Sequence, residues 1–213
     1  MHTALSVILD EHSTLSALLR SINLLLDATR KHKITPDFAV LRALLFYIDE
    51  FPERLHHKKE SELLFPRLRE RSPEISPVLD RLDHDHAVSE KAVRDLQHEM
   101  LGCEMMADSA DGEARREHFE QSMHAYISTY LEHMRIEEHD VLPLAERVLT
   151  QADWAQLDTA FMRNRDPLTR READDAYRPL FKKILMSLPA PIGIGPAMEA
   201  MSVSRARPTF GAD

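Results

Sequence analysis

The sequence contains little cysteine, little glycine and few aromatic residues, and these shortages exclude several classes of protein. Cys103 is the single cysteine, so the chain has no disulfide framework and no thiolate metal site. Glycine occurs only 5 times in 213 residues, while leucine, alanine, glutamate and arginine are abundant. This composition favours an all-α fold. A hydrophobic content of 43% still allows a substantial core.

Long apolar runs and an excess of basic residues are also missing. No apolar run is long enough for a membrane span, and Asp10 and Glu11 follow the N-terminal apolar residues too soon for a signal peptide. A net charge of −9 argues against a nucleic-acid binder, because neutralising phosphates requires a concentrated basic surface. With a single cysteine, the reducing cytoplasm is the expected compartment. No motif identifies a protein partner.

Apolar periodicity predicts four long helices, over residues 3–31, 35–69, 72–106 and 113–149. Thr35 with Pro36, and Ser72 with Pro73, are typical of helix starts, and Pro52 predicts a kink in the second helix. Short connections between long amphipathic helices imply antiparallel neighbours. We therefore expect an up-down-up-down four-helix bundle over residues 1–150.

The character of the sequence changes after Thr150, and residues 151–213 are predicted to form a C-terminal extension. Thr150 with Asp153 is typical of the start of a short helix, and a second short helix is expected around Pro179. From Leu188 onward the chain is interrupted by proline and glycine without periodicity.

A spaced triple, His-x3-Glu-x5-Pro, occurs once in the second predicted helix and again in the fourth. The two triples consist of His56, Glu60 and Pro66, and of His133, Glu137 and Pro143. A spacing of four residues places a histidine and a glutamate on one face of a helix, about 6 Å apart along its axis. This is a spacing that metal ligands use, and its repetition indicates a duplicated site.

The first and third helices each add one histidine to this pattern. His12 stands 44 residues before His56, and His86 stands 47 residues before His133. Each half of the chain is therefore interpreted as a histidine helix followed by a His-x3-Glu helix. His84 is an alternative to His86 if the third helix is rotated.

The six candidate ligands are four imidazoles and two carboxylates, which exceeds the needs of one tetrahedral zinc ion. They are His12, His56, Glu60, His86, His133 and Glu137. Nitrogen and oxygen donors without sulfur favour iron or manganese, with each carboxylate bridging two ions. The sequence therefore predicts a dinuclear metal site.

These segments resemble the hemerythrin-like, HHE cation-binding family. FPERLHHKKESELLFPRL is similar to the second-helix motif of that family and LEHMRIEEHDVLPLA to the fourth-helix motif, while the first and third ligand histidines lie in the segments DEH and DHDH. The resemblance covers residues 1–150 and implies a non-haem di-iron centre, for which manganese or zinc could substitute. It implies a small ligand such as O₂, NO or a peroxide-level oxidant.

The chain departs from the oxygen-carrying hemerythrins at two positions. Glu90 stands four residues after His86, where those proteins have a second histidine, and Glu138 stands five residues after His133, where they have an aspartate. Four histidines and two glutamates match di-iron cluster-repair proteins better. The open hypotheses are a protein that binds or senses a small oxidant, a di-iron oxidoreductase or iron-donating repair protein, and a metal store.

Several neighbours of the predicted ligands carry weaker expectations. His57 and His139 lie off the ligand face and are expected either beside the ligands or in solvent. Glu90 is either an additional carboxylate ligand or a residue beside the ligands or in solvent, and Glu62 and Glu138 are expected to face solvent or a neighbouring helix. Tyr126 and Tyr130 share the ligand stripe, where they either line the core or donate hydrogen bonds near the metal.

Overall fold

The computed structural model describes residues 2–163, 168 and 178–187, and the regular structure within these ranges is helical throughout. The prediction of an all-α protein is confirmed. The predicted tail from Leu188 onward lies outside the described residues.

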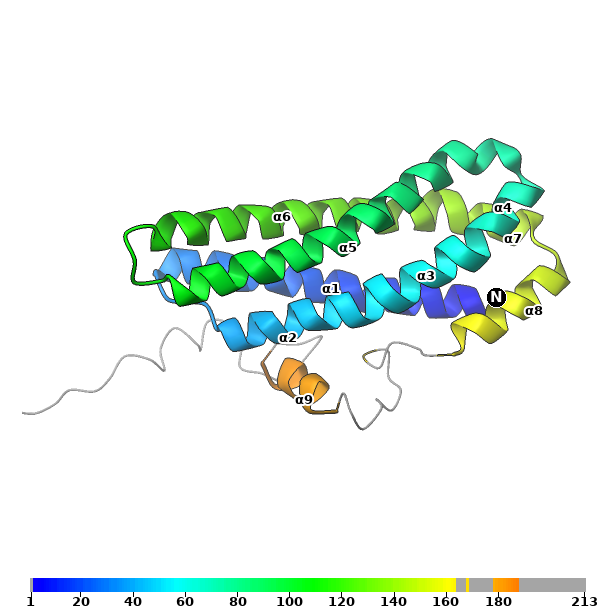
Figure 1. Cartoon of the computed structure of the whole chain (residues 1–213). Helices are drawn as coiled ribbons and strands as arrows, with labels where there is room; N and C mark the ends of the chain where they lie inside the picture. Colours follow the sequence, from blue (N-terminus) through cyan, green and yellow to red (C-terminus); the bar gives the residue numbers. More distant parts are fainter. Residues whose placement is uncertain (1, 164–167, 169–177, 188–213) are drawn as a thin grey trace, which may run out of the picture.

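Four long helical stretches lie side by side (Figure 1). The first is α1, Thr3–His32. The second consists of α2 (Phe38–Ile48), η1 (Asp49–His56), α3 (His57–Lys59), η2 (Glu60–Leu64) and α4 (Phe65–Arg71). The third consists of η3 (Pro73–Ile75) and α5 (Ser76–Met105), and the fourth of α6 (Gly112–Ile136), η4 (Glu137–Val141) and α7 (Leu142–Val148). α5 contacts both α2 and α6, and α1 contacts α6.

The helix ends have local causes, and one predicted start is wrong. Asp37, and not Thr35, caps α2, because its carboxylate accepts hydrogen bonds from the backbone N–H groups of Ala39 and Val40. Gly112 begins α6 where a side chain would overlap the backbone oxygens of residues 106 and 107. The tight turn at residues 106–111 therefore requires a glycine at this point.

The second stretch is not a regular α-helix around Pro52. Residues 49–56 form a π-helix, η1, in which the N–H of His57 bonds the carbonyl of Pro52, five residues earlier. Proline has no N–H and its ring clashes with the preceding turn, so a wider turn is the local solution. The predicted kink is thus spread over a π-helical segment, which changes the faces on which the following residues lie.

A π turn also begins at each glutamate of the repeated triple. Glu60 starts η2 and Glu137 starts η4, and the carbonyl of each accepts a hydrogen bond from the residue five positions later. Pro66 and Pro143 follow directly after those bonded residues and open α4 and α7. The proline of the triple therefore accompanies the same backbone geometry in both halves of the chain.

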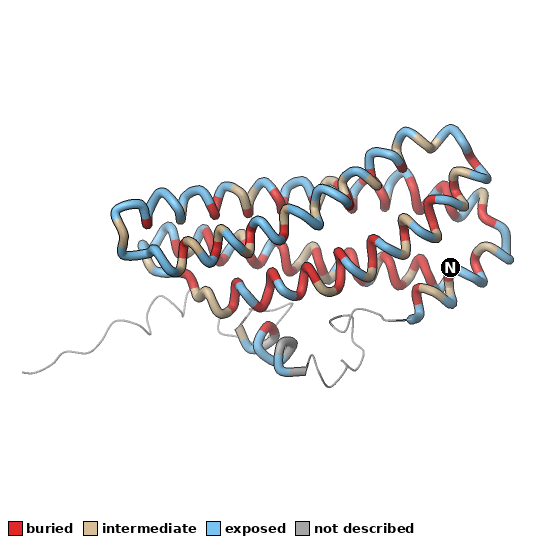
Figure 2. The backbone as a smooth tube through the Cα atoms, viewed as in Figure 1, coloured by how far each residue is buried: buried red, intermediate tan, exposed pale blue. Residues whose placement is uncertain are grey.

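The core consists of two hydrophobic clusters with a polar layer between them. One cluster extends from Leu15 of α1 to Met134 of α6, and the other joins Ile8 of α1 to Ile136 of α6 and to α7 and α8. Buried residues line the inner faces of all four stretches (Figure 2). His12 lies on α1 between the parts that belong to the two clusters, so polar groups there are enclosed by apolar packing on both sides.

Two further helices pack on the bundle, α8 (Gln151–Phe161) and α9 (Arg178–Ser187). Thr150 and Asp153 form the predicted capping box at the start of α8. α8 packs on α1, where the carboxylate of Asp158 accepts a hydrogen bond from the backbone N–H of Ala4 at 2.7 Å. α9 contacts α2 and buries Ile184 there.

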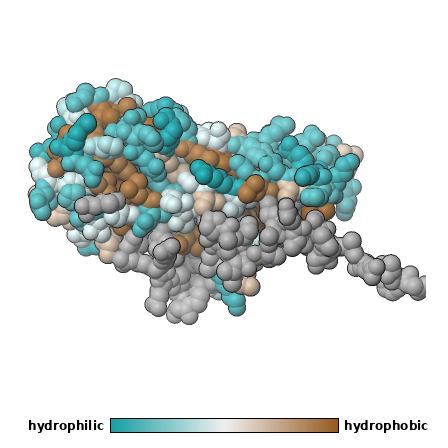
Figure 3. All heavy atoms as spheres, turned by 180° about the vertical axis from the view of Figure 1, so that it is seen from behind, coloured by the Kyte–Doolittle hydropathy of each residue, from teal (hydrophilic) through white to brown (hydrophobic). Residues whose placement is uncertain are grey.

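The described helices have polar outer faces. None of the helices in the described ranges is long and apolar enough to cross a membrane. Seen from behind, the surface of these residues is largely hydrophilic with smaller hydrophobic areas (Figure 3).

Candidate metal centre

The polar layer between the two hydrophobic clusters contains all six predicted ligands. α1 contributes one histidine and α5 another, and each of the other two stretches contributes a histidine and, one turn later, the glutamate that begins a π turn. Each of the six is at most 8% exposed: His12, His56, Glu60, His86, His133 and Glu137. The structure brings these side chains together, and their role as ligands remains a prediction.

The Nε2 atoms of the histidines face one another in two pairs. His12 Nε2 lies 3.1 Å from His56 Nε2, and His86 Nε2 lies 3.0 Å from His133 Nε2. Two groups of donor atoms suited to a cation each contain one histidine pair together with Glu60 and Glu137, and a third group joins His57 to His86 and His133.

Both carboxylates reach both histidine pairs. Glu60 Oε1 lies 3.2 Å from His56 Nε2, while its Oε2 lies 3.6 Å from His86 Nε2. Glu137 Oε2 lies 3.3 Å from His12 Nε2, while its Oε1 lies 3.2 Å from His133 Nε2. Each glutamate therefore turns one oxygen toward each pair, which is the arrangement that a bridging carboxylate needs.

The four carboxylate oxygens of Glu60 and Glu137 are suited to bind a cation rather than to accept hydrogen bonds from the nearby histidines. They are buried and have no hydrogen-bond partner among the described residues, although the imidazole nitrogens are close. The short distances are therefore ion-pair contacts whose angles do not suit hydrogen bonds. Two donors bound at right angles to one ion at about 2.1 Å would lie about 3.0 Å apart, close to the spacing seen here.

The outer nitrogen of each histidine faces a second set of side chains, which follows the same duplication. His56 Nδ1 contacts Glu11 at 2.7 Å and His12 Nδ1 contacts Glu138 at 3.1 Å. In the other pair, His86 Nδ1 contacts the hydroxyl of Ser61 at 2.9 Å and His133 Nδ1 lies 3.6 Å from Asp85. A partner at Nδ1 fixes the ring and leaves the Nε2 lone pair directed into the site.

The charges of this layer favour an added positive charge. Burial opposes protonation of His12, yet the carboxylates of Glu137 and Glu138 outweigh it and raise the pKa of His12 to about 9. Burial likewise opposes protonation of His56, and the charges of Glu60 and Glu11 raise its pKa well above the usual range. The carboxylates therefore attract protons when no other cation compensates them.

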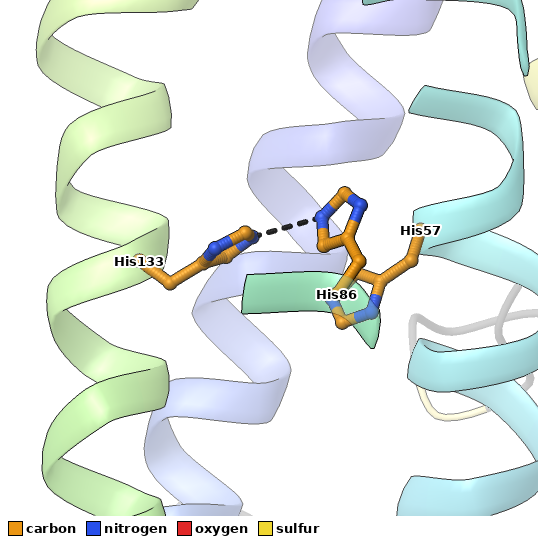
Figure 4. Close-up of side chains that lie close together, drawn as sticks. All are labelled: His57, His86 and His133. Carbon is orange, nitrogen blue, oxygen red and sulfur yellow. Dashed lines mark hydrogen bonds between the residues drawn. The ribbon is translucent and has the colours of Figure 1, made fainter. Parts of the chain in front are cut away.

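Another buried group lies beside the second histidine pair. Of the two expected positions for His57, beside the ligands or in solvent, the structure shows the first: it is 4% exposed and its ring stacks on that of His86 with centroids 3.9 Å apart. Figure 4 shows His57 beside His86 and His133, which are joined by the dashed contact. Burial and the neighbouring histidines hold the pKa of His57 well below its usual value, so this ring is neutral.

Hydrogen bonds hold His57 from both sides. Its Nδ1 contacts Glu53 at 3.0 Å and its Nε2 contacts the hydroxyl of Tyr130 at 2.7 Å. Tyr126 and Ser89 donate hydrogen bonds to the carboxylate of Glu53. Burial raises the pKa of Glu53 to about 7, against the effect of these donors. Both tyrosines therefore line the core and also bind groups beside the candidate centre.

The remaining neighbours are placed as follows. His84 is exposed, so His86 is the histidine of the third stretch that joins the cluster. Glu90 is exposed and pairs with Arg94, and Glu62 is exposed as expected. His139 is exposed on η4.

Comparison with known proteins agrees with this geometry. The family model described as the hemerythrin HHE cation-binding domain matches residues 3–145, a range that includes all six candidate ligands. No curated protein and no solved structure gave a match. The chain belongs to the hemerythrin HHE cation-binding domain family.

Proposed function

We propose that this protein is a non-haem di-iron protein that binds or senses O₂, NO or a related small oxidant. The observation that carries the proposal is the sharing of Glu60 and Glu137 between the two groups of donors. Two cations bridged by two carboxylates would use all six candidate ligands. One cation would leave a histidine pair and two buried carboxylate oxygens uncompensated.

The donor set supports iron. Imidazole and carboxylate donors without sulfur suit iron, with manganese or zinc as possible substitutes. His12 and His56 would hold one ion and His86 and His133 the other, while Glu60 and Glu137 would bridge both. Bound iron would supply the redox chemistry and the affinity for a diatomic ligand. The two apolar clusters cover the layer from both ends of the bundle.

A small cavity beside the first histidine pair supports a ligand of diatomic size. Its volume is about 10 Å³, close to the space that one water molecule requires. Leu15, Phe51, Leu55 and Met134 supply an apolar lining. The polar side consists of Glu11, His12, His56, His57, Lys59 and Tyr130. This space suits a small uncharged ligand and would exclude a larger organic substrate.

We propose an up-down-up-down four-helix bundle as the scaffold of this centre, because short connections at residues 33–37, 72–75 and 106–111 join the long stretches. A cytoplasmic location is also a proposal. It is supported by Cys103, which is buried and forms no disulfide.

The position of Glu90 favours one alternative function. In an oxygen carrier a histidine would be expected four residues after His86, but here Glu90 is exposed and pairs with Arg94. The third stretch thus gives one ligand where a carrier would use two. This supports an iron-donating or oxidoreductase role for the same centre, and metal storage is the remaining alternative.

Metal analysis of protein purified without added chelator tests the proposed function. We expect about two iron atoms per chain, and a sharp loss in His56→Ala or His133→Ala. His118→Ala is the matched control, because that histidine is exposed and lies on α6 away from the layer. Equal iron in all three variants would show that the layer is not the metal site.

Anaerobic addition of O₂ or NO then separates the alternatives. An optical change that reverses on degassing supports binding or sensing. Irreversible oxidation within seconds supports turnover, and no response to either gas supports storage.

A further inference from the structure

The two histidine pairs share the carboxylates of Glu60 and Glu137 but have unequal outer partners. His57 lies beside the second pair alone, and its two ring nitrogens already contact Glu53 and Tyr130. Glu11 directly precedes His12 and contacts His56 of the second stretch. In the same way, Asp85 directly precedes His86 and faces His133 of the fourth stretch. The residue after each bridging glutamate, Ser61 or Glu138, faces the histidine of α5 or α1. Corresponding positions in the two halves can therefore be compared directly.

The outer partners of the first pair are two carboxylates, each of which contacts one histidine. Glu11 lies 2.7 Å from His56 Nδ1 and its side chain is only 6% exposed, so solvent screens it little. Glu138 lies 3.1 Å from His12 Nδ1. A carboxylate at this nitrogen makes the imidazole a stronger donor toward a metal and fixes its orientation.

The outer partners of the second pair are weaker. The hydroxyl of Ser61 accepts from His86 while it donates to Asp83, and the charge of Asp83 is partly neutralised by Arg69. Asp85 is 3.6 Å from His133 Nδ1, an ion-pair distance beyond a hydrogen bond, and that buried nitrogen has no hydrogen-bond partner among the described residues. A carboxylate one methylene longer, as at the corresponding Glu11, would close this gap.

The second pair also lies beside larger openings. A cavity of about 320 Å³ between α5 and α6 is lined by Asp85, His57 and His133, together with small side chains such as Ala92 and Ala125. A second hollow of about 540 Å³ is lined by Ser61, Asp83 and His86. The cavity beside the first pair has a volume of only about 10 Å³.

We infer that the two cation positions, which rest on the proposed di-iron function, are unequal: the ion at His12 and His56 is retained, and the ion at His86 and His133 exchanges through the α5–α6 side. Asp85 and Ser61 are the positioning residues that set this difference. Removal of an outer partner typically lowers metal affinity about 10–100-fold, so the retention of the two ions should differ by a similar factor.

Cobalt(II) release from the full-length protein tests the inference. Protein loaded anaerobically with cobalt is mixed with excess EDTA, and the visible absorption of bound cobalt is followed over time. We expect two phases of similar amplitude, about one ion each, with rates that differ at least tenfold. Simultaneous loss of both ions in a single phase would overturn the inference.

Variants that make the outer partners of the two histidine pairs alike show which release phase belongs to which ion. Asp85→Glu should slow the fast phase about tenfold and leave the slow phase unchanged, whereas Glu11→Asp should accelerate the slow phase. Asp27→Glu is the matched control, because it makes the same change on an exposed side chain of α1 away from the layer. An effect of Asp85→Glu on the slow phase alone would reverse the assignment and overturn the inference.

Ser61→Glu gives a second variant if Asp85→Glu does not fold, because it places in the second half the residue found at Glu138. It should slow the fast phase as well. The total amplitude of cobalt release separates failure of the proposed function from failure of this inference. Protein that binds fewer than two cobalt ions contradicts the dinuclear centre. Protein that releases two ions at equal rates contradicts only the unequal retention of the two ions.

Discussion

Two segments of the molecule carry the repeated ligands, one with His56 and Glu60 and the other with His133 and Glu137. They are alike at the ligands but differ one and two turns before the histidine. Both begin a π turn at the glutamate. Three residues before the histidine, the first segment has Glu53 and the second has Tyr130; seven residues before it, they have Asp49 and Tyr126. The duplication is thus strict only where the metal would bind.

The differing positions are complementary. Glu53 accepts a hydrogen bond from Tyr126 at 2.9 Å, and Tyr130 contacts His57, which in turn contacts Glu53. One half supplies buried acceptors and the other supplies phenolic donors, so the two halves satisfy each other across the bundle. Two identical halves would have opposed either two carboxylates or two phenols. The asymmetry therefore stabilises the pairing of the halves.

The similarity of the two segments at the ligands is tested most strongly by removing Glu60 or Glu137, the two carboxylates that both histidine pairs share. Glu60→Ala and Glu137→Ala should have equal effects, each lowering metal content from about two ions to one or fewer, because each glutamate contacts both histidine pairs. Metal content measured by elemental analysis checks this prediction.

Glu138→Ala is the control for this comparison. It removes a carboxylate that contacts only His12, so two ions should still bind at saturating metal, with about tenfold weaker affinity. Loss of the second ion in Glu138→Ala but not in Glu137→Ala would mean that η4 uses the spacing of the oxygen carriers.

Removal of the metal should have the next largest effect. A ligand at a free concentration one hundred times its Kd stabilises the native state by about 2.7 kcal/mol, and in a chain of this size that corresponds to about 5–10 °C in Tm. Chelation should lower the Tm by this amount in a thermal scan. Identical Tm values with and without metal would show that the donors are not used in the folded protein.

The smallest effects should come from the positions that differ between the segments. Tyr126→Phe removes one donor from the buried Glu53, and Tyr130→Phe removes the partner of His57 Nε2. Each loss should cost about 1–2 kcal/mol of stability, or about 2–8 °C in Tm, with two ions still bound. Thermal scans with metal analysis check both, and Ser128→Ala, on an exposed position of α6, should change neither.

The sequence was sufficient to place the six candidate ligands in one layer. The signal is local for the two His-x3-Glu pairs, whereas His12 and His86 were found by comparing the two halves of the chain. A histidine and a glutamate four residues apart share a helical face whatever the tertiary structure, and the repetition of His56 with Glu60 as His133 with Glu137 distinguished the pattern from chance. The capping box at Thr150 was predicted for the same reason.

The burial of His57 could not be predicted from α-helical periodicity. The π-helix η1 has five-residue hydrogen bonds around Pro52, so residues after it lie on other faces than a 3.6-residue period assigns. The outer partners were missed because Glu11 and Asp85 act on histidines of other stretches. A usable signal was present, since the position before each single histidine and the position after each glutamate could have been compared between the halves.

The packing of α8 has a consequence for how protein fragments should be chosen. The family match ends at residue 145, but Phe161 lies edge-on to the ring of His56 at 6.3 Å and is fully buried together with Leu157. A fragment cut at the end of the matched region would uncover one wall of the first histidine pair and lose part of an apolar cluster. The region matched by the family model is therefore smaller than the region that packs around the candidate centre.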